Sequence, residues 1–376
     1  MPSPVLSAAS ATRTDPVSLL RSLIAIPSLT GEEGPAADYI EGKARAAGVD
    51  VWRHDDNVVL SAGSGENTLL WNSHLDVVPP SAGHPYDAFD PVMKDGWIYG
   101  RGSVDAKASG AAMVSAFLQM SESGAIPAGR RLMVALTACE EGGGAYNGLE
   151  SIRPKLPEPS AVVIGEPTGL VPCVAQKGLL ILKIHAHGTA AHAGRPKSGV
   201  NAISRASAAI QAIERLTLDR TDPFLGAPTV TVTTIEGGTA RNAVPDHCVF
   251  AVDIRTTPAY THEEIIAHVR EVLAPLAGVE VEVYSNRFVP CATPDGSAIR
   301  AAALAACSNV HGKALMPTGS PTASDWIFMH DRPAVKLGPG ESRRSHTAEE
   351  RIRASQVHAA QQVYTDLAQT YFATGE

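Results

Sequence analysis

The amino-acid sequence predicts a two-domain α/β protein, in which a smaller ferredoxin-like domain is inserted into a larger one. The chain has 376 residues, more than one ordinary hydrophobic core accommodates. Apolar segments suited to buried strands recur among helical segments in its first part, as in α/β domains. From about residue 177 the expected order becomes strand, helix, strand, strand, helix, strand, which is the split β-α-β unit. We therefore expect one domain from residues 1–176 and 289–376, and an inserted domain over residues 177–288.

The first part of the chain begins with two helices. Asp15 and Pro16 are the expected N-cap and first-turn proline of the first helix, and Pro27 ends it. The preceding residues 1–14 are rich in Ser, Ala and Thr and are expected to form a loose tail. The second helix is expected over residues 36–47. The other elements of this part are strands over residues 49–53, 57–62, 68–72, 131–137 and 161–164, and an Ala-rich helix that ends near residue 120.

The inserted domain and the last part of the chain complete the expected order of elements. In the insert we expect strands over residues 179–187, 229–235, 248–255 and 279–284, and helices over residues 199–216 and 261–273. The first pattern then resumes. Asp295 is expected to cap an Ala-rich helix, residues 334–337 to form a strand, and residues 350–371 to form the last helix.

The composition excludes several classes of protein. A hydrophobic content of 44% with 19% charged residues is typical of a globular chain rather than a disordered one. The net charge of −8, with no basic block, argues against binding to nucleic acid or to an anionic membrane surface. The five cysteines are scattered and form no CxxC pair, and no apolar run reaches about 18 residues. We therefore expect a cytoplasmic protein without disulfide bonds or membrane spans.

A histidine and an aspartate stand together where an apolar strand is expected to end. His74 and Asp76 follow the segment TLLWNS and are two residues apart, so their side chains share one face of an extended chain. The histidine can bind a metal while the carboxylate orients its ring from behind. The alternative is an edge-strand histidine capped by a neighbouring carboxylate, and this pair by itself favours that alternative.

Further acidic residues at strand ends shift the balance toward a metal site. Glu140 and Glu141 follow the strand over residues 131–137, and Glu166 follows the strand over residues 161–164. Ligands of α/β sheets bind at the carboxyl ends of the strands, so we expect these side chains to converge. Carboxylates and imidazoles without thiolates suit zinc, cobalt or manganese. The full candidate set is His74, Asp76, Asp105, Glu140, Glu141, Glu166 and His346.

The motifs around these residues resemble those of a known family. They are HLD at 74–76, GRGSVDAK at 100–107, CEEGG at 139–143, GEPT at 165–168, AHAGRP at 191–196, GPG at 338–340 and SHTAEE at 345–350. In this order they are similar to the dinuclear zinc metallohydrolases that include acetylornithine deacetylase, succinyl-diaminopimelate desuccinylase, aminoacylase-1 and glutamate carboxypeptidase. The resemblance covers nearly the whole chain. It implies a catalytic domain of the zinc-exopeptidase type, with a central mixed β-sheet flanked by helices and an inserted lid and dimerisation domain.

The resemblance implies a centre of two divalent metal ions, with zinc the expected metal and cobalt the alternative. His74 and Glu166 would bind one ion, and Glu141 and His346 the other. Asp105 would bridge both ions. Two cations in such a site lower the pKa of water from 15.7 toward about 7.

Two further residues next to the metals receive roles from the resemblance. Asp76 would orient His74 from behind. Glu140 would be the general base, which takes a proton from the activated water and passes it to the leaving amine. The alternative for Glu140 is a third metal ligand.

The remaining site residues belong mainly to the insert. His192 matches a histidine that reaches the active site of the partner subunit and donates a hydrogen bond to the oxyanion. Asn242 matches an asparagine that contacts substrate. Arg255 matches an arginine that pairs with the substrate carboxylate, and its alternative is a salt bridge within the lid. Gly338 and Gly340 would present backbone amides near the substrate.

The resemblance implies a homodimeric enzyme that hydrolyses a small N-acyl amino acid. The expected substrate is N-acetylornithine or a close N-acyl basic amino acid, with a place in arginine or lysine biosynthesis, and Asp325 or Glu341 would pair with its basic side chain. One alternative is a succinyl-diaminopimelate desuccinylase or aminoacyl-lysine hydrolase, and another is a dipeptidase or carboxypeptidase. A catalytically inactive dimeric binding protein is disfavoured because all seven positions are filled. The sequence does not determine the acyl group, the native metal, whether the lid is open or closed, or whether His192 acts in its own subunit or in the partner.

Overall fold

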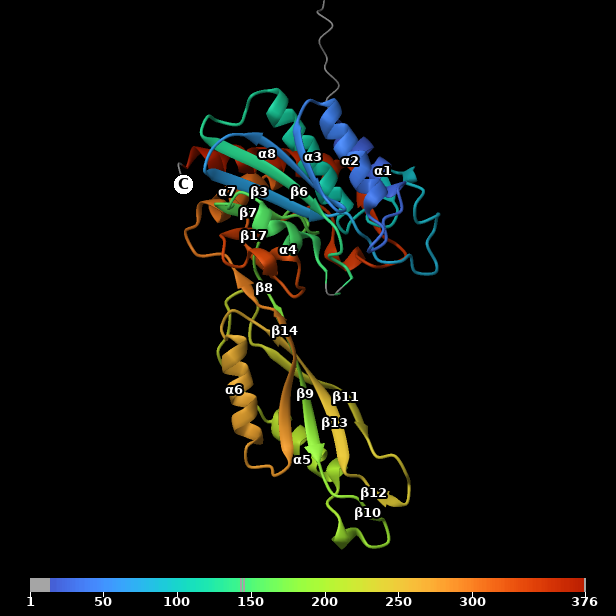
Figure 1. Cartoon of the computed structure of the whole chain (residues 1–376). Coiled ribbons are helices and arrows are strands. Elements are labelled where there is room, and N and C mark those ends of the chain that lie inside the picture. Colours follow the sequence, from blue (N-terminus) through green and yellow to red (C-terminus); the bar gives the residue numbers. More distant parts are fainter. Residues whose placement is uncertain (1–13, 143, 145, 375–376) are drawn as a thin grey trace, which may run out of the picture. The chain divides into compact units, whose positions relative to one another are not determined.

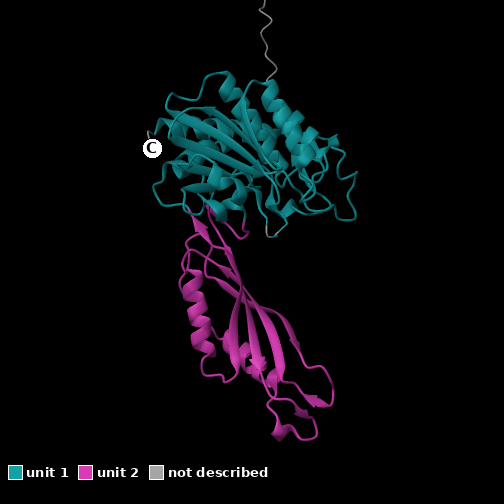
Figure 2. Cartoon of the chain, in the orientation of Figure 1, with its two compact units in different colours: residues 1–173, 293–317, 324–376 teal, residues 174–292, 318–323 magenta. Residues whose placement is uncertain are grey.

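The computed structural model describes residues 14–142, 144 and 146–374, so nearly all of the expected tail lies outside the described part. The chain forms two compact units (Figure 2). Unit 1 comprises residues 1–173, 293–317 and 324–376, and unit 2 comprises residues 174–292 and 318–323. No pattern in the sequence indicated that the short segment 318–323 belongs with the insert.

Unit 1 is built on a mixed β-sheet with helices around it, which confirms the predicted fold class (Figure 1). In spatial order its main strands are β1 (Asp50–His54), β2 (Asn57–Gly63), β6 (Arg130–Thr137), β3 (Asn67–His74), β7 (Ala161–Ile164) and β17 (Ala334–Lys336). The pairs β1–β2 and β2–β6 are antiparallel, whereas the pairs β6–β3, β3–β7 and β7–β17 are parallel. Strands β3 and β7 are almost entirely buried, which explains their continuous apolar sequences.

The helices of unit 1 pack around a helix that carries small apolar residues. They are α1 (Pro16–Ile24), α2 (Gly34–Ala46), α3 (Lys107–Glu122), α4 (Gly148–Ile152), α7 (Ala298–His311) and α8 (Ala354–Ala373), with 3-10 turns η1 (Arg153–Lys155), η3 (Asp325–Met329) and η4 (Ser342–Arg344). Nearly all of α3 is buried, between α1, α8 and the strands β3 and β6. Asp15 caps α1 as predicted, since its carboxylate accepts the Ser18 amide at 2.8 Å.

The predicted starts of the last two helices were wrong. Helix α7 begins after Ser297, and the side chain of Asp295 forms an ion pair with Arg300 instead of a cap. Helix α8 begins at Ala354 because the residues before it form β18 (Arg351–Arg353). This strand joins a small sheet with β5 (Trp97–Tyr99) and β4 (Met93–Lys94). Pairing with a strand distant in sequence therefore overrides the local helical pattern.

Unit 2 has the ferredoxin-like order of elements that the sequence predicted. Its elements are β9 (Gly178–His187), α5 (Ala202–Glu214), β11 (Thr229–Gly237), β13 (His247–Thr256), α6 (His262–Leu273) and β14 (Val279–Phe288). The strands form an antiparallel sheet in the order β11-β13-β9-β14. Both helices contribute to one apolar core with the buried residues of the sheet. Residues alternate between this core and the opposite, partly exposed face.

Short elements complete unit 2. They are β8 (Cys173–Gln176), β10 (Ala191–His192), η2 (Pro196–Ser198), β12 (Ala243–Val244), β15 (Cys291–Ala292) and β16 (Thr318–Ser320). Strand β8 begins at the last residue of unit 1 and pairs with β15 and β16. All five cysteines lie in the described part of the chain, and none forms a disulfide bond. Within that part, no helix has the length and apolar character needed to cross a membrane.

Candidate metal centre

The candidate metal ligands of unit 1 meet at one edge of its sheet. Strand β3 ends at His74, and the parallel strand β6 ends at Thr137, its partner in register. Glu140 and Glu141 follow β6 after a short turn. On the other side of β3, the parallel strand β7 ends just before Glu166. Parallel strands end at the same edge, so the sheet itself brings these side chains together.

His74 is buried and has one ring nitrogen directed toward other candidate ligands. Its Nδ1 lies 3.0 Å from the backbone oxygen of Asp76, which holds the ring in place. Its Nε2 lies 3.5 Å from Asp105 Oδ1 and 3.8 Å from Glu166 Oε1. This nitrogen is buried and has no hydrogen-bond partner. A buried polar atom without a partner is costly, and a cation at this position would supply the partner.

Asp105 lies between two imidazoles. Its Oδ1 faces His74 Nε2 and its Oδ2 faces His346 Nε2, each at 3.5 Å. His346 Nε2 also lies 2.8 Å from Glu141 Oε1. The carboxylate therefore presents one oxygen to each half of the cluster, which is the arrangement that a bridging ligand requires.

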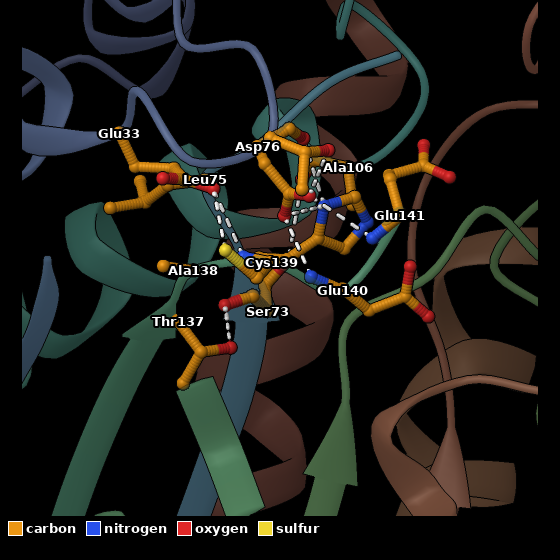
Figure 3. A network of polar contacts seen from close by, with 12 residues as sticks. Glu33, Ser73, Leu75, Asp76, Ala106, Thr137, Ala138, Cys139, Glu140 and Glu141 are labelled. Atoms are coloured by element: carbon orange, nitrogen blue, oxygen red, sulfur yellow. Dashed lines mark hydrogen bonds and ion pairs between the residues drawn. The ribbon is translucent and has the colours of Figure 1, made fainter. Parts of the chain in front are cut away.

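Asp76 holds the turn that carries the two glutamates (Figure 3). Its Oδ1 accepts the Glu140 amide at 3.1 Å, and its Oδ2 accepts the Glu141 amide at 3.0 Å and the Thr30 hydroxyl at 2.8 Å. Burial raises the pKa of Asp76, but the hydrogen bond and charge of His74 and these donors outweigh it, so the pKa lies below its usual value. The Asp76 carboxylate thus fixes the turn, while the backbone oxygen of Asp76 contacts His74.

Glu350 holds the loop that carries Asp105. Its Oε1 accepts the amides of Val104 at 2.9 Å and Asp105 at 3.1 Å. Its Oε2 accepts the Gly102 amide at 3.1 Å and Arg101 Nη1 at 2.6 Å. Both members of this ion pair are buried, with side chains 1% and 0% exposed. The peptide bond after Asp105 is cis.

Sequence reasoning missed the roles of Glu350 and Arg101, although both lie in recognised motifs. It also missed Glu33, whose buried carboxylate accepts the Cys139 amide at 3.0 Å and so fixes the start of the 139–141 turn. The only available signal was an acidic or basic residue beside a ligand motif. Such a residue looks like ordinary surface charge until the fold shows what it contacts.

The electrostatics of the cluster fit divalent cations. Burial, and then the charge of Glu166, raise the pKa of Glu140 well above its usual range. Burial, and then the charge of Asp105, raise the pKa of Glu166 to about 8. Ligand atoms lie within 4.8 Å of one another in two groups, His74–Asp105–Glu141 and His74–Glu140–Glu166. The buried carboxylates repel one another, and nothing in the cluster balances their negative charge in full. Two divalent ions of the zinc class would supply that positive charge.

The glycines of the 338–340 segment pack a loop of the site. Gly338 N–H donates to Thr168 Oγ1 at 3.2 Å, and its carbonyl accepts the Thr168 and Leu170 amides at 3.1 and 2.9 Å. A Cβ on Gly338 would lie 2.5 Å from the backbone oxygen of Glu166. In this structure the Gly338 amide thus supports the loop that carries Glu166, and the role of Gly338 and Gly340 in presenting amides near the substrate stays a prediction. The carbonyl of Gly340 has a similar contact and accepts the Gly169 amide at 2.7 Å.

Both acidic residues considered for a basic substrate side chain have partners within the protein. Asp325 is buried and accepts hydrogen bonds from Asn147 at 2.7 Å and Thr137 at 3.2 Å. Burial raises the pKa of this carboxyl to about 6. Glu341 pairs with two neighbouring arginines, Arg343 at 2.7 Å and Arg344 at 3.3 Å.

The remaining site residues belong to unit 2, where two of them meet. His192 pairs in register with Ala243, next to Asn242, on the exposed strands β10 and β12 (Figure 1). The carbonyl of Asn242 accepts the Ala193 amide at 2.8 Å. Arg255 lies elsewhere, on the partly exposed face of β13, and makes a two-point ion pair with Asp253 at 2.9 and 3.2 Å. This is the salt bridge considered as its alternative.

Comparison with known proteins places the chain in a family. The model of peptidase family M20/M25/M40 matches residues 70–370. The succinyl-diaminopimelate desuccinylases of Dinoroseobacter shibae and Cereibacter sphaeroides KD131 are both 29% identical to it; the alignments cover 96% of this chain and 100% and 99% of theirs.

Solved structures show the same fold. The aminopeptidase PepT of Bacillus cereus superposes with a TM-score of 0.77 at 24% identity, over 96% of this chain and 99% of that one. The Bacillus subtilis YXEP protein, a dinuclear metal-binding peptidase of the M20 family, gives a TM-score of 0.78 at 15% identity, over 98% and 100% of the chains. The match to the family model shows that the chain belongs to peptidase family M20/M25/M40, and the cluster at its strand ends agrees with this. Members of this family are metal-dependent hydrolases of amide bonds.

Proposed function

We propose that this enzyme removes a dicarboxylic acyl group from the amino nitrogen of an amino acid, with N-succinyl-diaminopimelate as the first candidate substrate. The observation that carries the proposal is the place of Asp105, with one carboxylate oxygen toward each of two imidazoles at 3.5 Å. That arrangement suits a pair of cations that act on one amide bond. Relatives that match along almost the whole chain are named desuccinylases, which supports this acyl group.

The proposed ligands divide into two sets around Asp105. His74 and Glu166 would hold one divalent ion, Glu141 and His346 would hold the other, and Asp105 would bridge them. Zinc suits these nitrogen and oxygen donors, and cobalt is the alternative. When bound, the two ions act as Lewis acids that polarise the scissile carbonyl and make water acidic at neutral pH.

The proton transfers are proposed for Glu140. Its carboxylate would take a proton from water as the water attacks the amide carbon, and would deliver it to the leaving amine nitrogen. Two structural facts support this role. The backbone amide of Glu140 is fixed by Asp76 at 3.1 Å, and its carboxylate lies within 4.8 Å of ligand atoms of His74 and Glu166, which places it beside the water that the ions would bind.

The expected preference for N-acetylornithine has less support. The relatives reported above are desuccinylases by name, and Asp325, one of the two acidic residues considered for the basic side chain, is buried and hydrogen-bonded within unit 1. A succinyl group instead carries a second carboxylate, which needs a cationic partner. Arg255 could serve if it exchanged Asp253 for the substrate, since its guanidinium already holds a carboxylate at two points.

A hydrolysis assay tests the proposed substrate and metals together. Chelator-treated enzyme is reloaded with zinc or cobalt and given N-succinyl-diaminopimelate, N-acetylornithine and dipeptides, and release of the primary amine is measured. We expect no turnover without metal, restoration by either ion, and the highest kcat/KM for the succinylated substrate. A higher kcat/KM for N-acetylornithine would overturn the proposed acyl group. Full activity after complete metal removal would overturn the metal centre.

Unit 2 is proposed to form a homodimer along its edge strand. Strand β11 is at the edge of the sheet, and Ile235 on it is 51% exposed. Ile203 on the neighbouring helix α5 is 41% exposed. The unpaired backbone groups of an edge strand are a template for pairing with another chain. The paired strands β10 and β12, with the loops around them, form what we call the tip of unit 2, and they carry His192 and Asn242. A dimer would also allow this tip to act in a partner's active site, where both residues would contact the oxyanion or the substrate.

Mixing two inactive variants tests whether His192 acts across such a dimer. Each homodimer of His192→Ala or Glu140→Ala should have little activity, because loss of an oxyanion donor costs about 10²–10³ in rate. After unfolding and refolding together, hybrid dimers contain one site with both residues intact if His192 acts in the partner's site. We expect activity to return to about a quarter of wild type on equal mixing, as half the dimers are hybrids with one intact site of two. Activity that stays at the level of the unmixed variants would place His192 in its own subunit's site or outside catalysis.

A further inference from the structure

Three histidines and two glutamates gather on the partly exposed face of the sheet in unit 2. His185 and His187 are two residues apart on β9 and so share this face. His247 on β13 pairs in register with His187. On the other side of β9, Glu280 of β14 pairs in register with His185, and Glu282 follows on the same face. None of these five side chains has a role in the proposed reaction.

Two of the three imidazoles have the spacing of ligands around one zinc ion, and the third lies beside them. The ring centroids lie 6.3 Å apart for His185 and His187, 5.7 Å for His185 and His247, and 5.5 Å for His187 and His247. His185 Nδ1 lies 3.4 Å from His247 Nε2. Two nitrogens bound to a tetrahedral zinc ion at about 2.0–2.1 Å lie about 3.3–3.4 Å apart. The two nitrogens thus have the separation of a ligand pair, whereas 3.4 Å is long for a hydrogen bond.

Carboxylates stand behind two of the rings. Glu282 Oε2 lies 2.7 Å from His185 Nε2, and Glu280 Oε2 lies 3.5 Å from His187 Nε2. Metal-binding histidines usually donate their second ring N–H to a carboxylate, which fixes the tautomer and makes the other nitrogen a better ligand. At 2.7 Å the contact of His185 is a hydrogen bond and leaves its Nδ1 as the metal-binding nitrogen, whereas the longer contact of His187 leaves that side chain less constrained.

We propose that His185, His187 and His247 form a binding site for a divalent transition metal ion of the zinc class, separate from the centre in unit 1. His185 Nδ1 and His247 Nε2 are already placed as two ligands. His187 completes the site by rotation of its side chain, which is 47% exposed. The rotation is required because, among the described residues, only the groups of unit 1 have three ligand atoms within 4.8 Å of one another. Imidazole nitrogens favour zinc, nickel or copper over calcium or magnesium.

The site would fix the root of the tip that carries His192 and Asn242. Strand β9 ends at His187, and the chain then enters the tip; the chain returns from the tip into β13 at His247. An ion bound by His187 and His247 would add a second link between β9 and β13 at the point where the tip begins. Metal binding to the folded state would also stabilise unit 2 against unfolding.

Metal counting on the full-length, tag-free chain tests the proposal. Wild type, His247→Ala and His185→Gln are dialysed against micromolar zinc, and the bound zinc per chain is measured by elemental analysis. Each variant is expected to bind one ion fewer than wild type. His311→Ala removes an exposed histidine from the end of α7 and serves as the matched control, which should bind as many ions as wild type. Equal zinc content in wild type and both cluster variants would overturn the site.

A thermal measurement distinguishes loss of the ion from loss of the fold. Without zinc, the cluster variants should unfold at the same temperature as wild type, because the replaced side chains lie on the partly exposed face. With zinc, wild type and His311→Ala should gain a larger increase in Tm than the cluster variants. An identical zinc-dependent increase in all four proteins would also overturn the proposal. The difference of one ion does not depend on how many ions unit 1 holds, so this test is independent of the proposed reaction.

Discussion

Replacing Glu140 by glutamine is expected to lower kcat by about 10²–10⁴ while the metal ions stay bound, because a positioned general base contributes an effect of this size. Glutamine keeps the shape of the side chain but cannot accept a proton from water. The turn that carries it should persist, since Asp76 accepts hydrogen bonds from the backbone amides of residues 140 and 141, which the substitution leaves in place. Zinc content and Tm should therefore resemble those of wild type.

The proper comparison for this variant is Glu150→Gln, which removes an exposed carboxylate from helix α4 of the same unit. It should have wild-type kcat and zinc content. If Glu140→Gln lost one zinc ion per chain, Glu140 would be a metal ligand, the alternative considered from the sequence. If it turned over at the wild-type rate, another group would have to move the proton.

Replacing Glu350 by glutamine is expected to destabilise unit 1 by about 3–5 kcal/mol, because it removes one partner of a buried ion pair. Arg101 would keep its charge without a counter-ion 2.6 Å away. The new amide group would also face either Arg101 or backbone amides, which are all donors. Urea unfolding of the metal-free protein measures this loss.

The same variant should also weaken metal binding in the protein that remains folded. Glu350 accepts the backbone amide of Asp105, so its loss would let the proposed bridging carboxylate move. Competition with a zinc-binding dye at low temperature measures this effect apart from stability. Glu349→Gln, an exposed neighbour, is the matched control and should change neither quantity. Wild-type stability and zinc affinity in Glu350→Gln would contradict both expectations.

The unit 1 cluster was accessible to sequence reasoning because it follows from the order of strands. Apolar runs that end in His74, Glu140 and Glu166 are local patterns, and parallel pairing makes their ends coincide. Asp105 and His346 do not follow strands of this sheet, so the order of strands alone could not place them beside the other candidates. Their contacts with His74 and Glu141 now stand on the geometry of the fold.

Features that depend on distant partners escaped prediction. Residues 351–353 look helical in sequence but pair with β5, and Gly338 looks like an open loop residue but packs against Glu166. The histidine cluster of unit 2 depends on the register of β13 on β9, which places His247 opposite His187. The residues between the two strands do not encode that register locally.

The long sequence separation between Glu350 and the loop that it holds has a consequence for biosynthesis. The hydrogen bond from the Asp105 amide to Glu350 joins residues 245 positions apart, and His346 comes from the same late stretch. A nascent chain that has exposed β3, β6 and β7 on the ribosome therefore still lacks the side chains that finish the cluster. Only after unit 2 and the last part of unit 1 have been translated can the pocket close around its ions, so metal loading is a late or post-translational event.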